Sequence, residues 1–174
     1  SGCGGAVYFE KSSSSVTVNC NFTDNSAKKG GAVYFDVSSS GKAVNCVFDG
    51  NSVSNSGAIF NNNALNVIAD TCIFKSSSDM TNNIQIIPPT LTVNNFTTSY
   101  KSREKLNFDL KTSEGRSIDN GIISISVYHK NNNSWVGNYI CLSGEGWEVD
   151  LLPGSYCASF NTEYAGFEPI QRTI

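Results

Sequence analysis

The sequence is poor in charge, and this excludes several classes of function. Only 16% of the 174 residues are charged, the net charge is −3, and the longest basic run is Lys28-Lys29. Nucleic-acid binding relies on clustered Lys and Arg that neutralise phosphates, so we expect no nucleic-acid partner. No apolar run approaches the roughly 20 residues that a membrane-spanning helix needs, so we expect no membrane insertion of this chain.

An initiator Met and a signal peptide are also missing, and Ser1 stands directly before a repeat motif. We therefore expect a monomeric fragment of a longer protein, with further repeats upstream. Helix-forming residues are scarce, and uncharged Ser, Asn and Thr supply most of the polarity. Runs such as Ser12–Ser15 and Asn131–Asn133 favour turns, because their short side chains hydrogen-bond to nearby backbone. The composition predicts an all-β fold.

A repeat of 26 residues occupies the first half of the chain. Gly4–Phe9 recurs as Gly30–Phe35 and, more weakly, as Ser56–Phe60, while a Cys-x-Phe block recurs in phase with it. Each unit holds two β-rich stretches separated by turns, so it suits one coil of a solenoid whose strands pair with those of the next coil. We predict a parallel β-helix over residues 1–87.

In such a stack each position of the repeat becomes a ladder of like residues. The first block predicts a small-residue ladder and an aromatic ladder, and the second predicts an aromatic ladder with cysteines on the same face. We expect the stacked aromatic ladders of both blocks to supply most of the interior. An Asn ladder, with Ser77 in the third copy, would satisfy backbone groups in a turn. The predicted ladders are Ala6, Ala32 and Ala58; Tyr8, Tyr34 and Phe60; Phe22, Phe48 and Phe74; Cys20, Cys46 and Cys72; and Asn25 and Asn51.

The third copy of the repeat decays, which is typical of a capping repeat. It loses one Gly, the Asn and the aromatic residue at position 61. Ile84 and Ile86 fall one 26-residue step after Ala58 and Phe60. We therefore expect a last partial strand near 84–87 that extends those two columns before Pro88-Pro89 ends the stack.

The motif Gly-Gly-Ala-Val/Ile-Tyr/Phe, followed by Cys-x-Phe-x-x-Asn, resembles the polymorphic-membrane-protein repeat. This repeat occurs in chlamydial surface proteins and in the adhesin-like proteins of methanogenic archaea, and the resemblance covers residues 1 to about 80. It implies a right-handed β-helix at the cell surface with a long face for adhesion.

After Pro88-Pro89 the period disappears and short alternating segments follow, separated by turn signals. This pattern predicts a β-sandwich over 88–174. Leu151–Tyr156 predicts a tyrosine corner, in which Tyr156 ties back to the preceding connection. The predicted strands are Leu91–Phe96, Lys105–Leu110, Ile122–Tyr128, Val136–Leu142, Trp147–Leu151 and Tyr156–Phe160.

This layout resembles the immunoglobulin-like repeats of the same archaeal adhesin-like proteins. It departs from them at Cys141–Gly146, where such repeats often carry Thr-Asp-x-x-Gly. The resemblance implies an immunoglobulin-like β-sandwich. The matching pieces are Leu91–Val93, Tyr100, Leu106–Leu110, Gly115, the Leu-Pro-Gly-x-Tyr corner and Tyr164–Phe167.

The predicted cysteine ladder is interpreted as buried free thiols. Three cysteines cannot all pair, neighbours in a parallel ladder are poorly oriented for a disulfide, and a linear column cannot converge on a metal. A disulfide between Cys141 and Cys157 stays open. However, Cys157 directly follows Tyr156 and should point away from the core if Tyr156 points inward.

The sequence contains no evident catalytic constellation. Polysaccharide-cleaving β-helices need carboxylates, or carboxylates with Arg or Lys, that converge on one face. We assign turn roles to Asp24 and Asp49 and a solvated loop position to His129, and we expect no enzyme activity, cofactor or metal. The acidic residues of the repeats, which contain no Arg or His, are Asp24, Asp36, Asp49, Asp70 and Asp79.

Exposed aromatic residues are the best candidates for ligand contact, because they dominate recognition hot spots. We select Trp135, Tyr128 and Tyr139 and assign Trp147 to the core. Acceptor patterns for N-glycosylation begin at three residues, of which the last is the most accessible. These are Asn21, Asn95 and Asn132. Intramolecular isopeptide bonds through Lys105 or Lys111 stay open.

Together these features favour a fragment of a cell-surface adhesin. It would attach to surface proteins or glycans of other cells by non-catalytic contact, in an extracellular location and an archaeal source. Two alternatives stay open. One is the C-terminal part of a carbohydrate-active β-helix enzyme whose catalytic coils lie upstream, and the other is a passive stalk that carries a distal binding domain.

Overall fold

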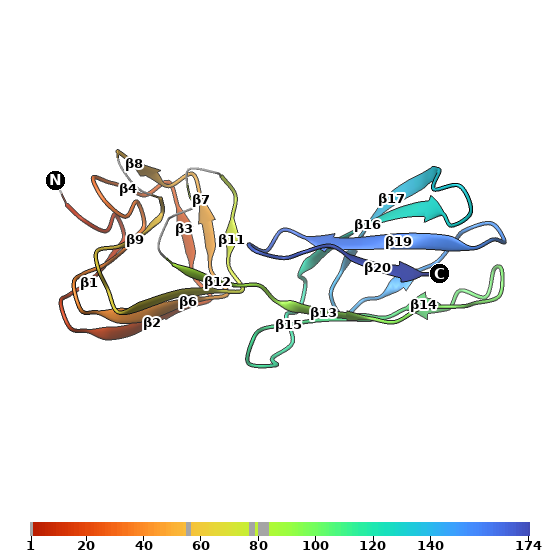
Figure 1. Ribbon diagram of the computed structural model, residues 1–174, viewed down its shortest axis with the longest axis horizontal. Helices are drawn as coiled ribbons and strands as arrows, with labels where there is room; N and C mark the ends of the chain where they lie inside the picture. Colours follow the sequence, from red (N-terminus) through yellow and green to blue (C-terminus); the bar gives the residue numbers. More distant parts are fainter. Residues whose placement is uncertain (1, 55–56, 77–78, 80–83) are drawn as a thin grey trace. The chain divides into compact units, whose positions relative to one another are not determined.

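The structure is a computed structural model that describes residues 2–54, 57–76, 79 and 84–174. Every regular element in these residues is a β-strand, which confirms the all-β class (Figure 1). The chain divides into two compact units, one of Ser1–Pro88 with Tyr164–Gly166 and one of Pro89–Glu163 with Phe167–Ile174. Parallel pairing builds the first unit and antiparallel pairing the second.

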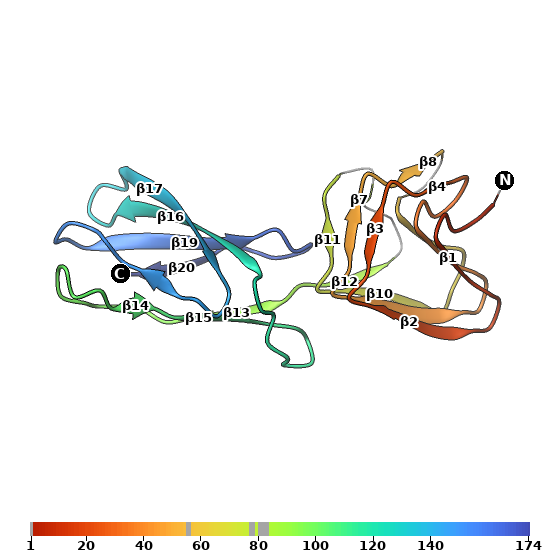
Figure 2. The same cartoon turned by 180° about the vertical axis from the view of Figure 1, so that it is seen from behind.

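Successive repeats add one strand each to the parallel sheets of the first unit, and Figure 2 shows these strands side by side. Strands pair at a 26-residue step, so that Tyr34 lies between Tyr8 and Phe60 in one sheet. This pairing is consistent with a β-helix-like fold. The sheets are β1 (Val7–Phe9), β5 (Val33–Phe35) and β9 (Ile59–Asn61); β2 (Ser14–Val18), β6 (Ser40–Val44), β10 (Asn66–Asp70) and β12 (Gln85–Ile87); β3 (Asn21–Thr23), β7 (Val47–Asp49) and β11 (Ile73–Phe74); and the short pair β4 (Ser26–Ala27) and β8 (Ser52–Val53).

The last strand of the stack does not extend the columns of Ala58 and Phe60, and that expectation is wrong. β12 pairs instead with β10, where Ile86 faces Ala69. The step from Ala69 to Ile86 is 17 residues (86 − 69), shorter than the 26 of the full repeats. Pro88 and Pro89 follow at once and lack the N–H groups that a further ladder would need.

Stacked aromatic rings and small side chains fill the interior of the first unit. Phe48 is fully buried, and its ring centroid lies 5.1 Å from that of Phe22 and 5.0 Å from that of Phe74. Phe35 is also fully buried and stacks on Phe9 at 4.8 Å. Beside these rings lie the small side chains Ala32, Ala43, Ala58, Ala69, Cys46 and Cys72.

The column of Tyr8, Tyr34 and Phe60 stacks as well, with centroids 5.2 and 5.3 Å apart, but it faces outward. Tyr8 is 48% exposed, while Tyr34 is only 4% exposed because the rings of Tyr8 and Phe60 cover it on both sides. None of the three rings belongs to the core cluster that holds Val33 and Phe35. Successive side chains of a strand point to opposite faces, so Val-Tyr-Phe turns its Val and Phe inward. The expectation that this column fills the interior is corrected.

The second unit is built on an antiparallel sheet of β17 (Trp135–Leu142), β16 (Ile122–His129), β19 (Tyr156–Thr162) and β20 (Ile170–Thr173), in that order. Phe108, the first residue of β15 (Phe108–Lys111), packs on Phe160 with ring centroids 6.4 Å apart, so β15 packs against the inner face of this sheet. The remaining antiparallel pairs are β13 (Thr90–Val93) with β15 (Phe108–Lys111), and β14 (Lys105–Leu106) with β18 (Trp147–Glu148).

The side chain of Tyr156 fixes the loop before β19 by a hydrogen bond. The hydroxyl of Tyr156 donates a hydrogen bond of 2.7 Å to the carbonyl of Leu152, and the Tyr156 ring is buried. A strand-start tyrosine bonded to the backbone a few residues upstream defines a tyrosine corner.

The aromatic ladders give a direct test of which column supports the fold. Replacing Phe48 with Ala removes a ring packed on both sides, and we expect a loss of about 3–5 kcal/mol in the free energy of unfolding. Replacing the outward-facing Tyr8 with Ala should cost about 1 kcal/mol. Denaturant unfolding followed by circular dichroism measures both losses, and equal losses would contradict the assignment of Phe48 to the interior and Tyr8 to the outside.

Candidate functional site

The polar side chains of the first unit are engaged in its turns. Asn51, which is 1% exposed, accepts hydrogen bonds at Oδ1 from the backbone N–H (3.2 Å) and Nδ2 (3.0 Å) of Asn25. Its Nδ2 donates to the carbonyl of Phe22 at 2.9 Å, and its N–H donates to Oδ1 of Asp79 at 2.9 Å. The carboxylate of Asp79 therefore follows the two Asn residues in the ladder, while Ser77 lies outside the described residues.

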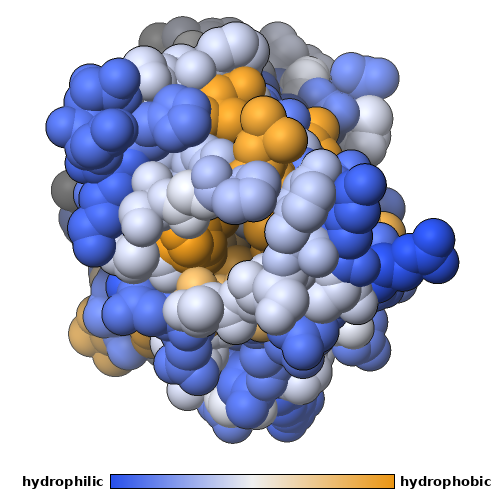
Figure 3. Space-filling view, turned by 90° about the vertical axis from the view of Figure 1, so that its right-hand side faces the viewer, coloured by the Kyte–Doolittle hydropathy of each residue, from blue (hydrophilic) through white to orange (hydrophobic). Residues whose placement is uncertain are grey.

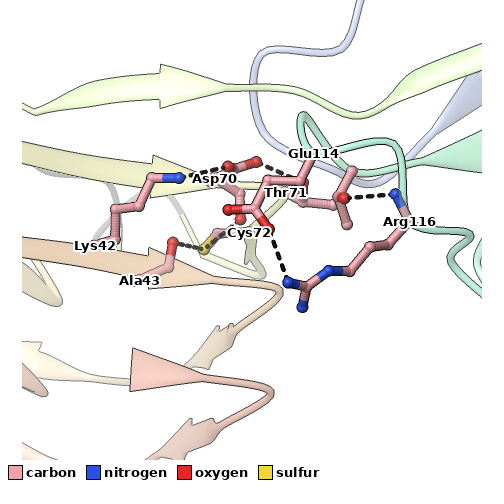
Figure 4. A network of polar contacts seen from close by, with 8 residues as sticks. Lys42, Ala43, Asp70, Thr71, Cys72, Glu114 and Arg116 are labelled. Carbon is pink, nitrogen blue, oxygen red and sulfur yellow. Dashed lines mark hydrogen bonds and ion pairs between the residues drawn. The ribbon is translucent and has the colours of Figure 1, made fainter. Parts of the chain in front are cut away.

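Asp70 is held from two sides inside the first unit (Figure 4). Its Oδ2 lies 3.2 Å from Nζ of Lys42, and its Oδ1 accepts a 2.8 Å hydrogen bond from the hydroxyl of Thr71. Contact with Cys46 and burial raise the pKa of the Cys72 thiol, which keeps it protonated as a core filler. This arrangement stabilises the stack.

Asp36 is engaged on the outside of the first unit. Its Oδ2 accepts a 2.6 Å hydrogen bond from the hydroxyl of Tyr8, and its Oδ1 accepts bonds from the N–H of Val37 and from Nδ2 of Asn62. These bonds favour the charged carboxylate and lower the pKa of Asp36. The bond to Asp36 also raises the pKa of Tyr8 to about 12.

Within the described ranges, no group of three or more His, Cys, Asp or Glu side chains could hold a metal ion. No helix in those ranges is long and apolar enough to cross a membrane. All six cysteines are free. Cys141 faces Ile123 on the inner side of the large sheet and Cys157 faces Tyr128 on its outer side, so the sheet separates the two thiols.

The outer face of the large sheet in the second unit has a different character. Along β16, Ile123, Ile125 and Val127 are buried in the core, so the residues between them point outward. The register then aligns most outward side chains of neighbouring strands in three rows, and we call this set the outer sheet face. Its rows are Ile140, Ser124 and Asn161; Asn138, Ser126, Ser159 and Gln171; and Trp135, Tyr128, Cys157 and Thr173. Beyond the first row, the outward Ile122, which is 40% exposed, pairs with Leu142.

None of the side chains in these rows carries a charge; nearly all offer a hydroxyl, an amide or an aromatic ring. Trp135 is 62% exposed, and its Nε1 donates to Oδ1 of Asn138 at 3.4 Å. One ammonium touches the edge of the face: Nζ of Lys130 lies 3.5 Å from the hydroxyl of Thr173 at the end of the third row. A hollow of about 340 Å³ on this face is lined by Ser126, Tyr128, Asn133, Cys157, Ser159 and Gln171.

Two of the three predicted contact residues come together on the outer sheet face. Tyr128 and Trp135 are direct partners across β16 and β17, beside a register shift that leaves Val136 as the extra residue. Tyr139 does not join them, because it faces Ile125 and its ring lies 4.8 Å from that of Trp147 on the inner side. Tyr139 is therefore removed from the candidate site.

The hydroxyl and amide residues of the hollow were missed in the sequence. Ser124 and Ser126 alternate with buried isoleucines in β16, and Cys157 and Ser159 alternate with buried residues in β19. A run of small polar residues at every second position therefore marks this face. Gln171 carries no comparable signal, since only the pairing of β20 with β19 brings it beside Ser159.

Other predicted residues take ordinary structural places. His129 is the last residue of β16 and packs 5.0 Å from the ring of Tyr156, which corrects its assignment to a solvated loop. Trp147 is buried. Asn132 is exposed and accepts a bond from the N–H of Ser134. Nζ of Lys111 pairs with Asp109 at 3.0 Å, on side chains 44% exposed, which lacks the burial that isopeptide formation needs.

A second hollow, of about 280 Å³, opens at the end of the second unit, where Figure 3 shows apolar side chains around a depression. The N–H of Phe96 donates to the carbonyl of Thr173 and the N–H of Tyr156 to that of Ile174, so the strands around the hollow are joined by backbone hydrogen bonds. Its apolar lining includes Phe96, Val149, Leu151, Leu152, Pro153 and Ile174.

Comparisons with protein-family models, with curated proteins and with solved structures found no match.

The buried amide of Asn51 provides a test of the turn ladder. Replacing Asn51 with Ala leaves the carbonyl of Phe22 and the N–H of Asn25 without their partner, and we expect a loss of about 2–4 kcal/mol in the free energy of unfolding. The matched variant Asn62→Ala removes one amide bond at the more exposed Asp36 and should lose about 1 kcal/mol. Thermal and denaturant unfolding provide the measurement; an Asn51→Ala loss no greater than that of Asn62→Ala would refute the ladder.

Proposed function

We propose that this chain is part of a cell-surface adhesin that attaches to surface proteins or glycans of other cells by non-catalytic contact. In this proposal the first unit is the end of a right-handed parallel β-helix and the second is an immunoglobulin-like β-sandwich. The in-register pairing at a 26-residue step supports the first assignment. The sheet of β17, β16, β19 and β20, covered by β15 and closed by the Tyr156 corner, supports the second.

The observation that carries the proposal is the outer sheet face. Exposed aromatic residues surrounded by hydrogen-bonding side chains form the centres of recognition surfaces. Tyr128 and Trp135 provide the aromatic part, and the rows of Ser, Asn and Gln provide the polar part. A hydrolytic site would need a pair of acidic groups, and the rows contain none.

The resemblance of the repeats to those of adhesin-like proteins supports the rest of the proposal, including the extracellular location and the archaeal source. Engagement of Asp36 and Asp70 in hydrogen bonds of the first unit favours a scaffold over an enzyme. The first unit then serves as the rigid support and the second unit as the contact surface.

Binding of the labelled fragment to whole cells tests this proposal. Replacing both Tyr128 and Trp135 with Ala should weaken binding by about 30-fold or more, because one aromatic hot-spot residue alone contributes about 2 kcal/mol. The control is Tyr100→Ala, which removes a ring that is 49% exposed and lies outside the three rows. Flow cytometry over a panel of microbial cells measures the binding.

Two results would count against the proposal. Absence of binding to every cell type would favour a passive stalk. Equal binding by the double variant and by Tyr100→Ala would assign the contact to another surface. Circular dichroism confirms that each variant is folded before its binding is compared.

A further inference from the structure

We propose that the ligand of the outer sheet face is a neutral saccharide, meaning an oligosaccharide without carboxylate, sulfate or phosphate groups. This inference rests on the proposed function and specifies its ligand. It is carried by three features of the face: its lack of charge, its pairing of aromatic with amide and hydroxyl groups, and its shallow hollow.

The charge of the face selects among ligand classes. An acidic glycan or a nucleic acid would need Arg or Lys side chains to neutralise its anions. The three rows contain none, and Lys130 reaches only the hydroxyl of Thr173 at one end. A cationic ligand or a calcium-bridged sugar would need carboxylates, and the rows contain no Asp or Glu. Charge complementarity therefore favours an uncharged ligand.

The hydrogen-bonding groups of the hollow suit sugar hydroxyls. A sugar hydroxyl both donates and accepts, and so do the hydroxyls of Ser126 and Ser159 and the amides of Asn133 and Gln171. These groups surround one hollow of about 340 Å³, at the small end of the range for ligand sites, which is about 300–1,000 Å³. No charged side chain of the described residues lines this hollow.

The aromatic side chains suit the apolar face of a sugar ring. One face of a pyranose presents a patch of C–H groups, and burying this patch against an aromatic ring removes apolar surface from water. Tyr128 lines the hollow, and Trp135, which is 62% exposed, is its cross-strand partner. A saccharide chain could thus bind its hydroxyls in the hollow and rest a ring on the indole.

A protein partner fits this face less well. The core of a protein interface is a contiguous, closely packed apolar patch. Exposed Ile140 in the first row lies beside Ile122, at the edge of the outer sheet face, whereas Trp135 stands in the third row with Asn138 between it and Ile140 on β17. These apolar side chains therefore form no single patch around the hollow. A protein bound here would remove water from the polar rows, and no apolar centre would offset the free-energy cost of that desolvation.

The experiment uses two reporters that the chain already carries. The wild-type fragment is titrated with neutral gluco-, galacto- and manno-oligosaccharides, and separately with polygalacturonate, sialylated oligosaccharides and heparin fragments. Tryptophan fluorescence is followed during each titration. The variant Trp135→Phe shows how much of the emission comes from Trp135 and how much from buried Trp147. Alkylation of Cys157 by iodoacetamide is followed by peptide mass, with Cys3 and Cys141 as internal references.

We expect at least one neutral oligosaccharide to shift the emission of Trp135 and to slow alkylation of Cys157 several-fold without slowing that of Cys3. Gln171→Ala and Ser126→Ala should each weaken this binding by about tenfold, because each removes a hydrogen bond made on the ligand. Tyr100→Ala should bind as the wild type does. The same oligosaccharide should also compete with whole cells for the fragment.

Several outcomes would overturn the inference. Binding of acidic glycans alone, or neutral binding that leaves Cys157 unprotected, would assign another ligand or another site. Cell binding that is lost in the Tyr128 and Trp135 double variant but unaffected by every neutral saccharide would reject the inference and keep the proposed function. Failure to bind both cells and glycans would reject the two together.

Discussion

In-register stacking of like side chains is the interaction on which the first unit depends. Parallel strands lie about 4.8 Å apart, and the ring centroids of Phe22, Phe48 and Phe74 follow at 5.1 and 5.0 Å. Each ring therefore packs on the equivalent ring of the next repeat. One repeat alone would leave both sides of its aromatic and amide groups exposed, so its stability comes from its neighbours.

The same constraint gives the polar side chains of the two units different surroundings. In the first unit several polar side chains bind the equivalent region of the neighbouring repeat, as Asn51 does with Asn25 and Asp70 with Lys42. In the second unit only the inner side of the large sheet is needed for packing, through residues such as Ile125 and Phe160. The outer side does not belong to this core, and the uncharged polar rows occupy it.

The sequence was informative wherever one residue repeats at a fixed step. The 26-residue period predicts the pairing of Phe22 with Phe48, because in-register strands need no knowledge of loop geometry. It misleads at Ile86, since the step there depends on a shortened connection that the period cannot show. The period also gives no sign that Tyr8 faces outward. Its aromatic character favours the interior, but the alternation of side chains along the strand directs it to the outside.

The candidate site was predictable only in part for a related reason. Trp135 and Tyr128 stand out as large aromatic residues, but Tyr139 has the same composition signal and lies on the opposite side of the sheet. One extra residue at Val136 decides which side Trp135 takes, and such an irregularity has no signature in composition. Gln171 enters the site only through long-range pairing of β20 with β19.

The uniform step of the repeats has a consequence for how such a chain changes over evolutionary time. Duplication or loss of one whole 26-residue segment by recombination between similar coding repeats would restore every ladder contact at the new junction. A partial segment would break all the ladders at once. The length of the first unit should therefore vary in whole repeats, while the strand at Ile86 with its shortened step and the sheet face around Trp135 stay unchanged.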